Sequence, residues 1–350
     1  MIRGEATSCK GVGLLSGTVP PGAFAPNRAK TGRHFFSVPV VLLFPSLPLV
    51  WGDSQYHSSS ECEDTMSNRT AILLITCQDQ QGLVARVSGF IHDFGGNIID
   101  SDHHTDRETG DFLMRTVFDL EGFQVPVEDM ETAFRPIAKI HHMNFQFHVS
   151  ARKPKVGILV SQYDHCLVDV LQRFRRGELA IDVPVIVSNH QTAEWWAQAF
   201  DIPFSYFPVS PGEKFKQEQQ VLDVLHTAEV ELVVMARYMQ ILTESFLQQV
   251  GCPIINIHHS FLPAFVGAKP YHQAYDRGVK IIGATAHYAT PDLDEGPIID
   301  QDVVRVGHRD TVQDLIRKGR DLEVMVFARA IRLHVERRIL VYGRKTVVFD

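Results

Sequence analysis

The sequence predicts an α/β protein with two folded parts, a small βαββαβ unit and then a doubly wound, mostly parallel sheet. Two observations predict this class. Between residues 70 and 149, strand-like and helix-like segments follow in the order strand, helix, strand, strand, helix, strand. From residue 156 onward, short apolar strands alternate with helices, which is typical of parallel sheets.

The order of elements in the first unit, residues 68–150, is that of a ferredoxin-like fold. We expect strands at 70–77, 97–106, 112–120 and 143–149, and helices at 82–95 and 125–142. The two helices have apolar residues at helical spacing, whereas 112–120 alternates apolar and polar residues as a half-buried strand does.

The second unit, residues 154–350, follows a polar linker at 150–156. Its expected strands lie at 156–161, 183–188, 231–237, 253–258 and 284–288, its helices at 164–176, 192–200, 214–228 and 310–337, and a short final strand within 341–349. The segments ELVVMAR and PIINIH are almost continuously apolar, which is typical of strands buried on both faces. In such sheets, ligands bind at the carboxyl ends of the strands.

Residues 1–65 differ in composition from the rest of the chain. Basic residues dominate at first, and an apolar stretch at 35–51 follows. Three prolines interrupt that stretch, so it cannot form a regular membrane-spanning helix. Three interpretations stay open: an organellar targeting segment, a signal sequence, or an extension upstream of a translation start at Met66. We expect a cytoplasmic protein, or a mitochondrial one if the segment is a targeting peptide.

The composition excludes several classes of function. A net charge of −7 supplies no basic field for nucleic acid or an anionic membrane. The 5 cysteines are scattered, which argues against a disulfide framework or a zinc ribbon and favours a reducing compartment. No GxGxxG or GxxxxGK[ST] motif follows the first strand of the second unit, and no HExxH motif occurs. We therefore expect neither a nucleotide cofactor nor a metal.

The candidate chemistry lies in the last third of the chain. Asn256 and His258 end the apolar strand 253–258, and Asp294 belongs to a carboxylate-rich turn between two strands. Residues two apart on a strand share a face, so Asn256 and His258 should point together, with Ile257 and His259 opposite. An amide, an imidazole and a carboxylate suffice for attack by water on an acyl carbon.

Three segments, NIHHSFLPAF, GATAHY and LDEGPII, resemble in order and spacing the catalytic domain of folate-dependent formyltransferases. DHCL and ARYMQIL make the chain similar to one branch, the formyltetrahydrofolate deformylase family. The first unit, with DQQGLV at its first strand-to-helix turn, resembles the ACT domain, a module that binds amino acids at paired interfaces. The resemblance covers about residues 68–340.

The resemblance implies a role for each matching residue. Asn256, His258 and Asp294 would be the catalytic trio. Substrate-binding candidates are Met239, Gln240, Ile241 and Leu242, through main-chain contacts to a pterin, with Leu293 in the opposite wall and Thr285 and His287 supporting the trio. In the ACT-like unit, Asp79, Gly82 and Asn97 are candidates for an amino-acid effector site, and such a unit implies a homo-oligomer. A purely structural or dimerising unit without a ligand stays equally open.

The implied reaction is hydrolysis of 10-formyltetrahydrofolate to formate and tetrahydrofolate, which would supply formate for purine synthesis and balance folate pools. The folate is the substrate, and no prosthetic group is expected. The related glycinamide ribonucleotide enzyme has a glycine-rich phosphate loop after its first strand, where this chain has SQYDHC with the carboxylate Asp164. With no second-substrate site visible, water is the expected acceptor. Two alternatives stay open, a formyltransferase that acts on an amine and a ligand-sensing protein.

Overall fold

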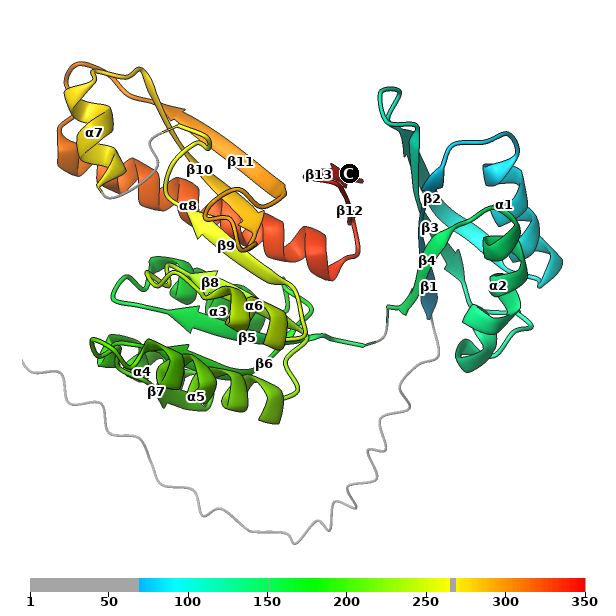
Figure 1. Ribbon diagram of the computed structural model, residues 1–350, viewed down its shortest axis with the longest axis horizontal. Helices are drawn as coiled ribbons and strands as arrows, with labels where there is room; N and C mark the ends of the chain where they lie inside the picture. The colour runs from blue at the N-terminus through cyan, green and yellow to red at the C-terminus, as the bar shows by residue number, and fades with distance from the viewer. Residues whose placement is uncertain (1–68, 151, 265–268, 350) are drawn as a thin grey trace, which may run out of the picture. The chain divides into compact units, whose positions relative to one another are not determined.

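The structure, a computed structural model, describes residues 69–150, 152–264 and 269–349. The expectations for residues 1–65 therefore lie outside the described residues. Within the described ranges, no helix combines the length and the apolar character that crossing a bilayer would require. The described chain forms a four-stranded sheet, a seven-stranded sheet and a two-stranded hairpin (Figure 1).

The four-stranded sheet confirms the predicted ferredoxin-like order. Its elements are β1 Thr70–Gln78, α1 Leu83–Asp93, β2 Asn97–Thr105, β3 Asp111–Asp119, the short 3₁₀ turn η1 Val127–Asp129, α2 Met130–Ile140 and β4 Asn144–Val149. The spatial order is β2-β3-β1-β4 with every pair antiparallel. Both helices pack on one face of the sheet, where Phe90 of α1 meets Phe134 of α2 edge to face with ring centroids 5.1 Å apart.

The seven-stranded sheet has the order β11-β10-β9-β8-β5-β6-β7. Its elements are β5 Lys155–Val160, α3 His165–Arg175, β6 Asp182–Ser188, η2 Gln191–Ala193, α4 Glu194–Ala199, β7 Phe204–Tyr206, α5 Lys214–Thr227, β8 Leu232–Ala236, α6 Glu244–Gln249, β9 Ile254–His258, α7 Pro270–Asp276, β10 Ile281–Tyr288, β11 Ile298–Arg305 and α8 Val312–Val335. Strands β5 to β9 pair in parallel, and β10 is antiparallel to both of its neighbours. The predicted, mostly parallel sheet is thus confirmed.

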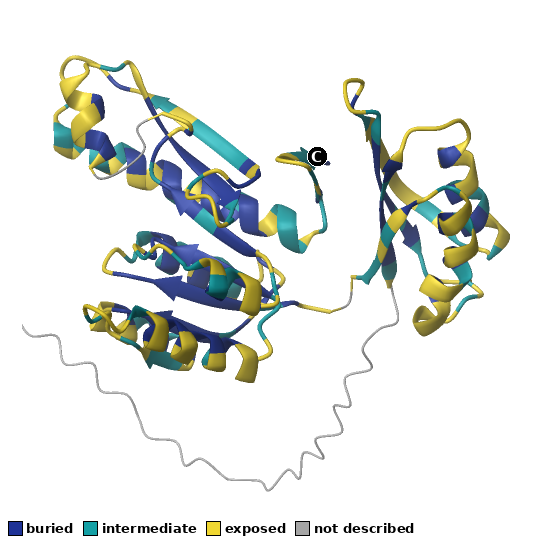
Figure 2. Ribbon diagram, in the orientation of Figure 1, coloured by how far each residue is buried: buried dark blue, intermediate teal, exposed yellow. Residues whose placement is uncertain are grey.

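Helices cover both faces of this sheet, as a doubly wound fold requires. Ile158 of β5 packs with α3 and α8 on one face, whereas Leu159, one residue on, packs with α5 and α6 on the other. The near-continuous apolar runs of β5, β8 and β9 follow from this double burial. Figure 2 shows the result, with buried strands between helices whose outer faces are exposed.

Some elements depart from the expectations. The final segment is a hairpin of β12 Ile339–Tyr342 and β13 Lys345–Val348, where we expected one strand, because Gly343 with φ 54° turns the chain back on itself. The expected helix 192–200 begins as the 3₁₀ turn η2, and the sequence did not predict β7, α6 or α7. These three elements have 3, 6 and 7 residues, too few to show a clear hydrophobic period.

Candidate active site

The polar residues of the predicted trio meet at the carboxyl end of β9. Strand β10 runs antiparallel beside it, so that His287 pairs with Asn256 and Thr285 with His258. Asp294 lies in the turn between β10 and β11, which returns to the same edge. Two adjacent strands and one turn therefore supply Asn256, His258, His287 and Asp294.

His258 and Asp294 form a close pair. Nδ1 of His258 lies 3.3 Å from Oδ1 of Asp294, and both side chains are largely buried. The hydrogen bond from His258 holds the pKa of Asp294 below its ordinary value, even though burial acts in the opposite direction. The Asp294 backbone has φ 57°, a left-handed conformation that Asp tolerates better than most residues. Asp294 is therefore an ionised carboxylate that fixes the imidazole of His258.

Asn256 is oriented by His287. Nδ2 of Asn256 lies 3.2 Å from Nε2 of His287, and Nδ1 of His287 lies 2.9 Å from the Tyr288 carbonyl oxygen. A carbonyl can only accept, so Nδ1 of His287 carries the proton and Nε2 accepts from the Asn256 amide. Burial lowers the pKa of His287, which keeps this ring neutral. The second N–H of the Asn256 amide stays available to a ligand.

The two pairs open onto one cavity of about 410 Å³, a volume in the usual range for small-molecule sites. His258 lines this cavity, and its Nε2 is buried without a hydrogen-bond partner among the described residues. The other lining residues include the predicted Asn256, His287, Asp294, Met239, Gln240, Ile241, Leu242 and Leu293. Met239, Ile241 and Leu293 are 52%, 60% and 54% exposed, which leaves apolar surface for the walls of a site for a flat aromatic ligand.

Some main-chain groups that were expected to contact the pterin already form hydrogen bonds within the protein. The Met239 N–H donates to Oγ of Ser161 over 2.9 Å, and the Ile241 carbonyl accepts a hydrogen bond from Nζ of Lys214. Met239 and Ile241 are therefore placed to contact a ligand through their side chains, whereas their bonded N–H and carbonyl groups are occupied.

Thr285 does not line the cavity. Its fully buried hydroxyl donates to the Ser260 carbonyl (2.9 Å) and accepts from the Leu262 N–H (3.1 Å). Nε2 of Gln301 also lies 2.9 Å from this oxygen. Thr285 thus connects the loop after β9 to β10. In this position it can support the catalytic trio, but it does not contact the cavity.

His259 and Ile257 are also among the residues that line the cavity. Ile257 is nevertheless buried in the core cluster that contains α8, as the alternation along β9 predicts, whereas His259 lies beyond the end of β9 at His258. Sequence reasoning also missed Gly296. A Cβ on Gly296 would lie 1.8 Å from the Tyr288 carbonyl oxygen, so only glycine lets the Asp294 turn approach β10 this closely.

Comparison with known proteins identifies the family. Residues 154–331 match the family described as formyl transferase, and residues 71–137 match the ACT domain. A formyltetrahydrofolate deformylase from Synechocystis is 52% identical over 284 residues, which are 81% of this chain and 100% of the relative. The chain belongs to the formyltetrahydrofolate deformylase family.

Solved structures agree with this family. A formyltetrahydrofolate deformylase from Pseudomonas syringae superposes with a TM-score of 0.79 at 44% identity, covering 82% of this chain and 96% of that one. A glycinamide ribonucleotide transformylase from Symbiobacterium toebii matches 58% of this chain and 97% of its own, with a TM-score of 0.55 and 31% identity. The fold of this matched part of the chain is therefore shared with a protein named as a transferase.

The three effector candidates of the ACT domain do not gather at one point within this chain. Asp79 and Gly82 follow the end of β1, whereas Asn97 begins β2. Asn97 and Thr70, the first residue of β1, both pair with Asp119, so Asn97 lies at the start of β1 and not at its end. The returning helix α1 causes this separation, because it carries the chain back along the whole strand.

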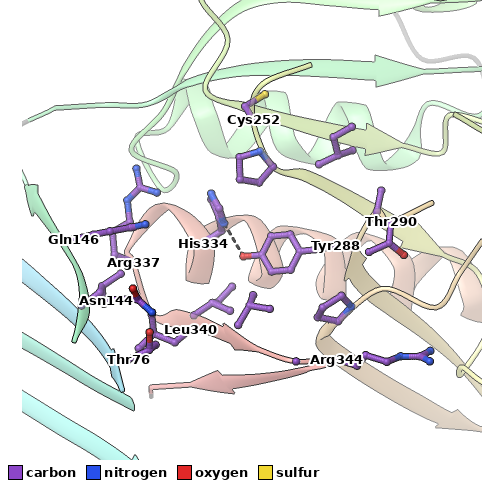
Figure 3. A pocket seen from close by; sticks show the side chains of 18 of the residues that line it. Thr76, Asn144, Gln146, Cys252, Tyr288, Thr290, His334, Arg337, Leu340 and Arg344 are labelled. Carbon is purple, nitrogen blue, oxygen red and sulfur yellow. Dashed lines mark hydrogen bonds between the residues drawn. The ribbon is translucent and has the colours of Figure 1, made fainter. Parts of the chain in front are cut away.

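A second and larger cavity, of about 800 Å³, shares Leu247, Ala289 and Thr290 with the smaller one but has Tyr288 and His334 in its lining. Figure 3 shows that Tyr288 and His334 face each other there, with the Tyr288 hydroxyl 2.7 Å from Nδ1 of His334. Burial lowers the pKa of His334 to about 4, so its neutral ring accepts this hydrogen bond. Asn256, His258 and Asp294 do not line this cavity, so we place the chemistry in the smaller one.

Proposed function

We propose that the protein hydrolyses 10-formyltetrahydrofolate to formate and tetrahydrofolate, with Asn256, His258 and Asp294 as its catalytic residues. One observation carries the proposal. An ionised carboxylate bonded to an imidazole, and an amide oriented by a second imidazole, open together onto a cavity with apolar walls. Membership of the deformylase family supports the same reaction.

The first step is attack by water on the formyl carbon. Asp294, whose pKa is held low by His258, accepts a hydrogen bond from the water and takes its proton as the O–C bond forms. A carboxylate is a weak base, so its contribution depends on position. The bond to His258 and the turn closed by Gly296 both fix that position.

The second step is stabilisation and collapse of the tetrahedral intermediate. Nε2 of protonated His258 and the free N–H of the Asn256 amide donate to the developing oxyanion. The C–N10 bond then breaks, N10 receives the proton that Asp294 had taken, and the resulting formic acid loses its own proton to solvent. Atoms and charge balance, and no prosthetic group is needed.

The pterin would lie between the apolar side chains of Met239, Ile241 and Leu293, with Gln240 and Leu242 beside it. Thr285 and His287 would act through other residues, Thr285 on the loop after β9 and His287 on Asn256. These roles belong to the proposal. The cavity lining and the hydrogen bonds support them.

We further propose that residues 68–150 form a regulatory domain and residues 154–350 a catalytic domain. The regulatory domain would bind an amino acid between paired copies, in a homo-oligomer, which could bring Asp79, Gly82 and Asn97 of different copies together. We place the protein in the cytoplasm, consistent with the free thiols of Cys77, Cys166 and Cys252, or in mitochondria if residues 1–65 direct it there. Its formate would feed purine synthesis.

An acceptor-free assay tests the function. Purified protein is incubated with 10-formyltetrahydrofolate and no amine, and formate and tetrahydrofolate are quantified. The proposal predicts equal amounts of both products. Asp294→Asn is the matched control, and it should form almost none of either product. An absolute requirement for an added amine would instead indicate a formyltransferase.

A further inference from the structure

The crevice where the winding of the large sheet reverses holds a cluster of charged side chains. β5 pairs in parallel with β6 on one side and with β8 on the other, so the chain changes direction across the β5–β8 pair. In doubly wound folds, ligands bind in the crevice at the carboxyl ends of the strands at this point. Here, Tyr163 and His165 follow β5, and Arg237 follows β8. We define these residues with Tyr271 and Glu323 as the crevice cluster.

Glu323 of α8 holds the cluster together. This carboxylate is 1% exposed; its Oε1 accepts from the Tyr271 hydroxyl at 2.6 Å and its Oε2 lies 2.8 Å from Nε2 of His165. Arg237 Nε lies 3.2 Å from the same Oε2. Burial acts to raise the pKa of Glu323, but His165 and the charge of Arg237 outweigh it and hold that pKa below its ordinary value. Glu323 is therefore an ionised centre that is hydrogen-bonded to Tyr271 and His165 and forms an ion pair with Arg237, whose buried Nε has no hydrogen-bond partner among the described residues.

Arg237 connects this cluster to the folate cavity. Arg237 is among the residues that line the cavity, together with His258 and His259, although only 7% of it is exposed. Its backbone has φ 63°, a conformation that disfavours a residue with a Cβ. The ring of Tyr163 lies 5.8 Å from the Arg237 guanidinium and 5.4 Å from that of Arg320, and so closes the cluster toward solvent. Arg237 is therefore a buried arginine with a left-handed backbone conformation that lines the same cavity as His258.

We propose that Arg237 is a specificity-determining residue, which occupies the space that an amine acceptor would need and so leaves water as the acceptor. This inference rests on the proposed function. With an amine R–NH₂, nitrogen would attack the formyl carbon, the C–N10 bond would break, and R–NH–CHO and tetrahydrofolate would form. The Arg237 guanidinium prevents that approach from the crevice side by its volume, and its charge repels a protonated amine.

A gap in the packing lets the cluster assemble. A Cβ on Gly319 of α8 would lie 2.1 Å from the Tyr271 hydroxyl oxygen, so the absence of a side chain there admits Tyr271 to Glu323. His165, Cys166 and Glu323 also lie within 4.8 Å of one another, close enough for metal ligands. However, Glu323 already accepts hydrogen bonds from Tyr271 and His165, and the adjacent Arg237 charge opposes a cation. The cluster is therefore better suited to hold Arg237 in place, where it fills the acceptor space, than to bind a metal ion.

The test replaces Arg237 in a way that the backbone tolerates. Arg237→Gly suits φ 63°, and the double variant Arg237→Gly with Glu323→Gln also removes the carboxylate charge left without its arginine. Arg337→Gly is the matched control, because Arg337 has φ 54° and lies outside both the crevice cluster and the lining of the folate cavity. Circular dichroism and folate binding establish that each variant is folded.

Each protein is given 10-formyltetrahydrofolate with isotopically labelled formyl carbon, and glycinamide as the amine probe. Labelled formate and labelled formylglycinamide are then separated and quantified. The wild type and Arg337→Gly should yield formate alone. For Arg237→Gly or the double variant, the ratio of formylglycinamide to formate should rise by about tenfold or more over the uncatalysed background, and it should increase with amine concentration.

Three results would overturn the inference. These are transfer to glycinamide by the wild type, formate as the only product of both folded Arg237 variants, or loss of hydrolysis in those variants with no gain of transfer. In the last case Arg237 would serve hydrolysis itself. Failure of the wild type to release formate without an amine is a separate result, since it contradicts the proposed function and not the role of Arg237 alone.

Discussion

Nδ2 of Asn256 lies 3.2 Å from Nε2 of His287, across the antiparallel pairing of β9 and β10. Because His287 donates its Nδ1–H to the Tyr288 carbonyl, its other nitrogen can only accept, which determines how the Asn256 amide is turned. A second imidazole therefore sets the direction of the amide that would hold the oxyanion.

Replacing His287 tests this relationship. His287→Ala removes the acceptor, so we expect kcat to fall about 10- to 100-fold while the KM for the folate changes little. His287→Gln offers a carbonyl oxygen in a similar place and should recover part of the loss. Steady-state kinetics of both variants provide the measurement. Equal losses in both, or a loss confined to KM, would show that His287 does not act through Asn256.

Asn256 itself should matter more. Asn256→Ala removes a donor to the oxyanion and should lower kcat by about 10²- to 10³-fold. The protein should stay folded, because Asn256 is only partly buried and, within the described ranges, its side chain is hydrogen-bonded to His287 alone. Single-turnover rates and a thermal melt, measured on the same sample, separate the two effects. An almost unchanged rate would remove Asn256 from the mechanism.

Asp294→Asn keeps the size of the side chain and tolerates φ 57°, so it isolates the charge. We expect turnover to drop by about 10²- to 10⁴-fold with folate binding retained. Asp294→Ala, which adds backbone strain at a positive φ, should lose stability as well. Binding is measured by fluorescence titration, and Asp294→Asn with near-normal turnover would exclude the carboxylate as the base.

Comparison of the wild type with Asp294→Asn should also reveal a pH effect on the unfolding free energy. The pKa of Asp294 is lower in the folded protein, so folding favours its ionised form, and that stabilisation is fully present above the unfolded aspartate pKa of about 3.9. It is lost as the pH falls through the folded pKa. In urea titrations, the difference in unfolding free energy between wild type and Asp294→Asn should be constant above about pH 5 and change below about pH 4. A difference independent of pH down to the acid transition would contradict this assignment.

Replacement of Thr285 should lower the stability of the fold more than it affects folate binding. Thr285→Val replaces the hydroxyl by a methyl group, which leaves the buried Leu262 N–H without its acceptor and the Ser260 carbonyl without this donor, while the Gln301 amide keeps only the Leu262 carbonyl. We expect a loss of about 1 to 3 kcal/mol in unfolding free energy. Thr285→Ser retains the hydroxyl and should lose less. If Thr285→Val were as stable as the wild type, the loop after β9 would not depend on this bond.

Much of this architecture could be predicted from the sequence, because it follows from local patterns. The apolar run before Asn256 predicts β9, and the turn chemistry of DLDEG predicts a return to the same sheet edge. The closeness of His258 and Asp294 follows from those two elements. By contrast, the bond between Asn256 and His287 depends on the β9–β10 register, which no local pattern specifies.

The crevice cluster could not be predicted from the sequence, for a different reason. Arg237 directly follows β8, Tyr271 lies in α7 and Glu323 lies in α8, and each looks like an ordinary surface or core residue in its own segment. Their meeting depends on α8 crossing behind β9 and β10 and on Gly319, whose importance is visible only when Tyr271 is already in place. The position of Arg237 directly after a buried strand was the one available signal.

The most direct test of the account is the origin of the oxygen in formate. Purified protein is given 10-formyltetrahydrofolate in water enriched in ¹⁸O, with no amine present, and the formate is analysed by mass spectrometry while the reaction is still incomplete. Attack by water on the formyl carbon predicts formate that carries one heavy oxygen, formed in step with tetrahydrofolate and almost absent with Asp294→Asn. Formate that carries no heavy oxygen, or that appears only after an amine is added, would contradict hydrolysis at this site.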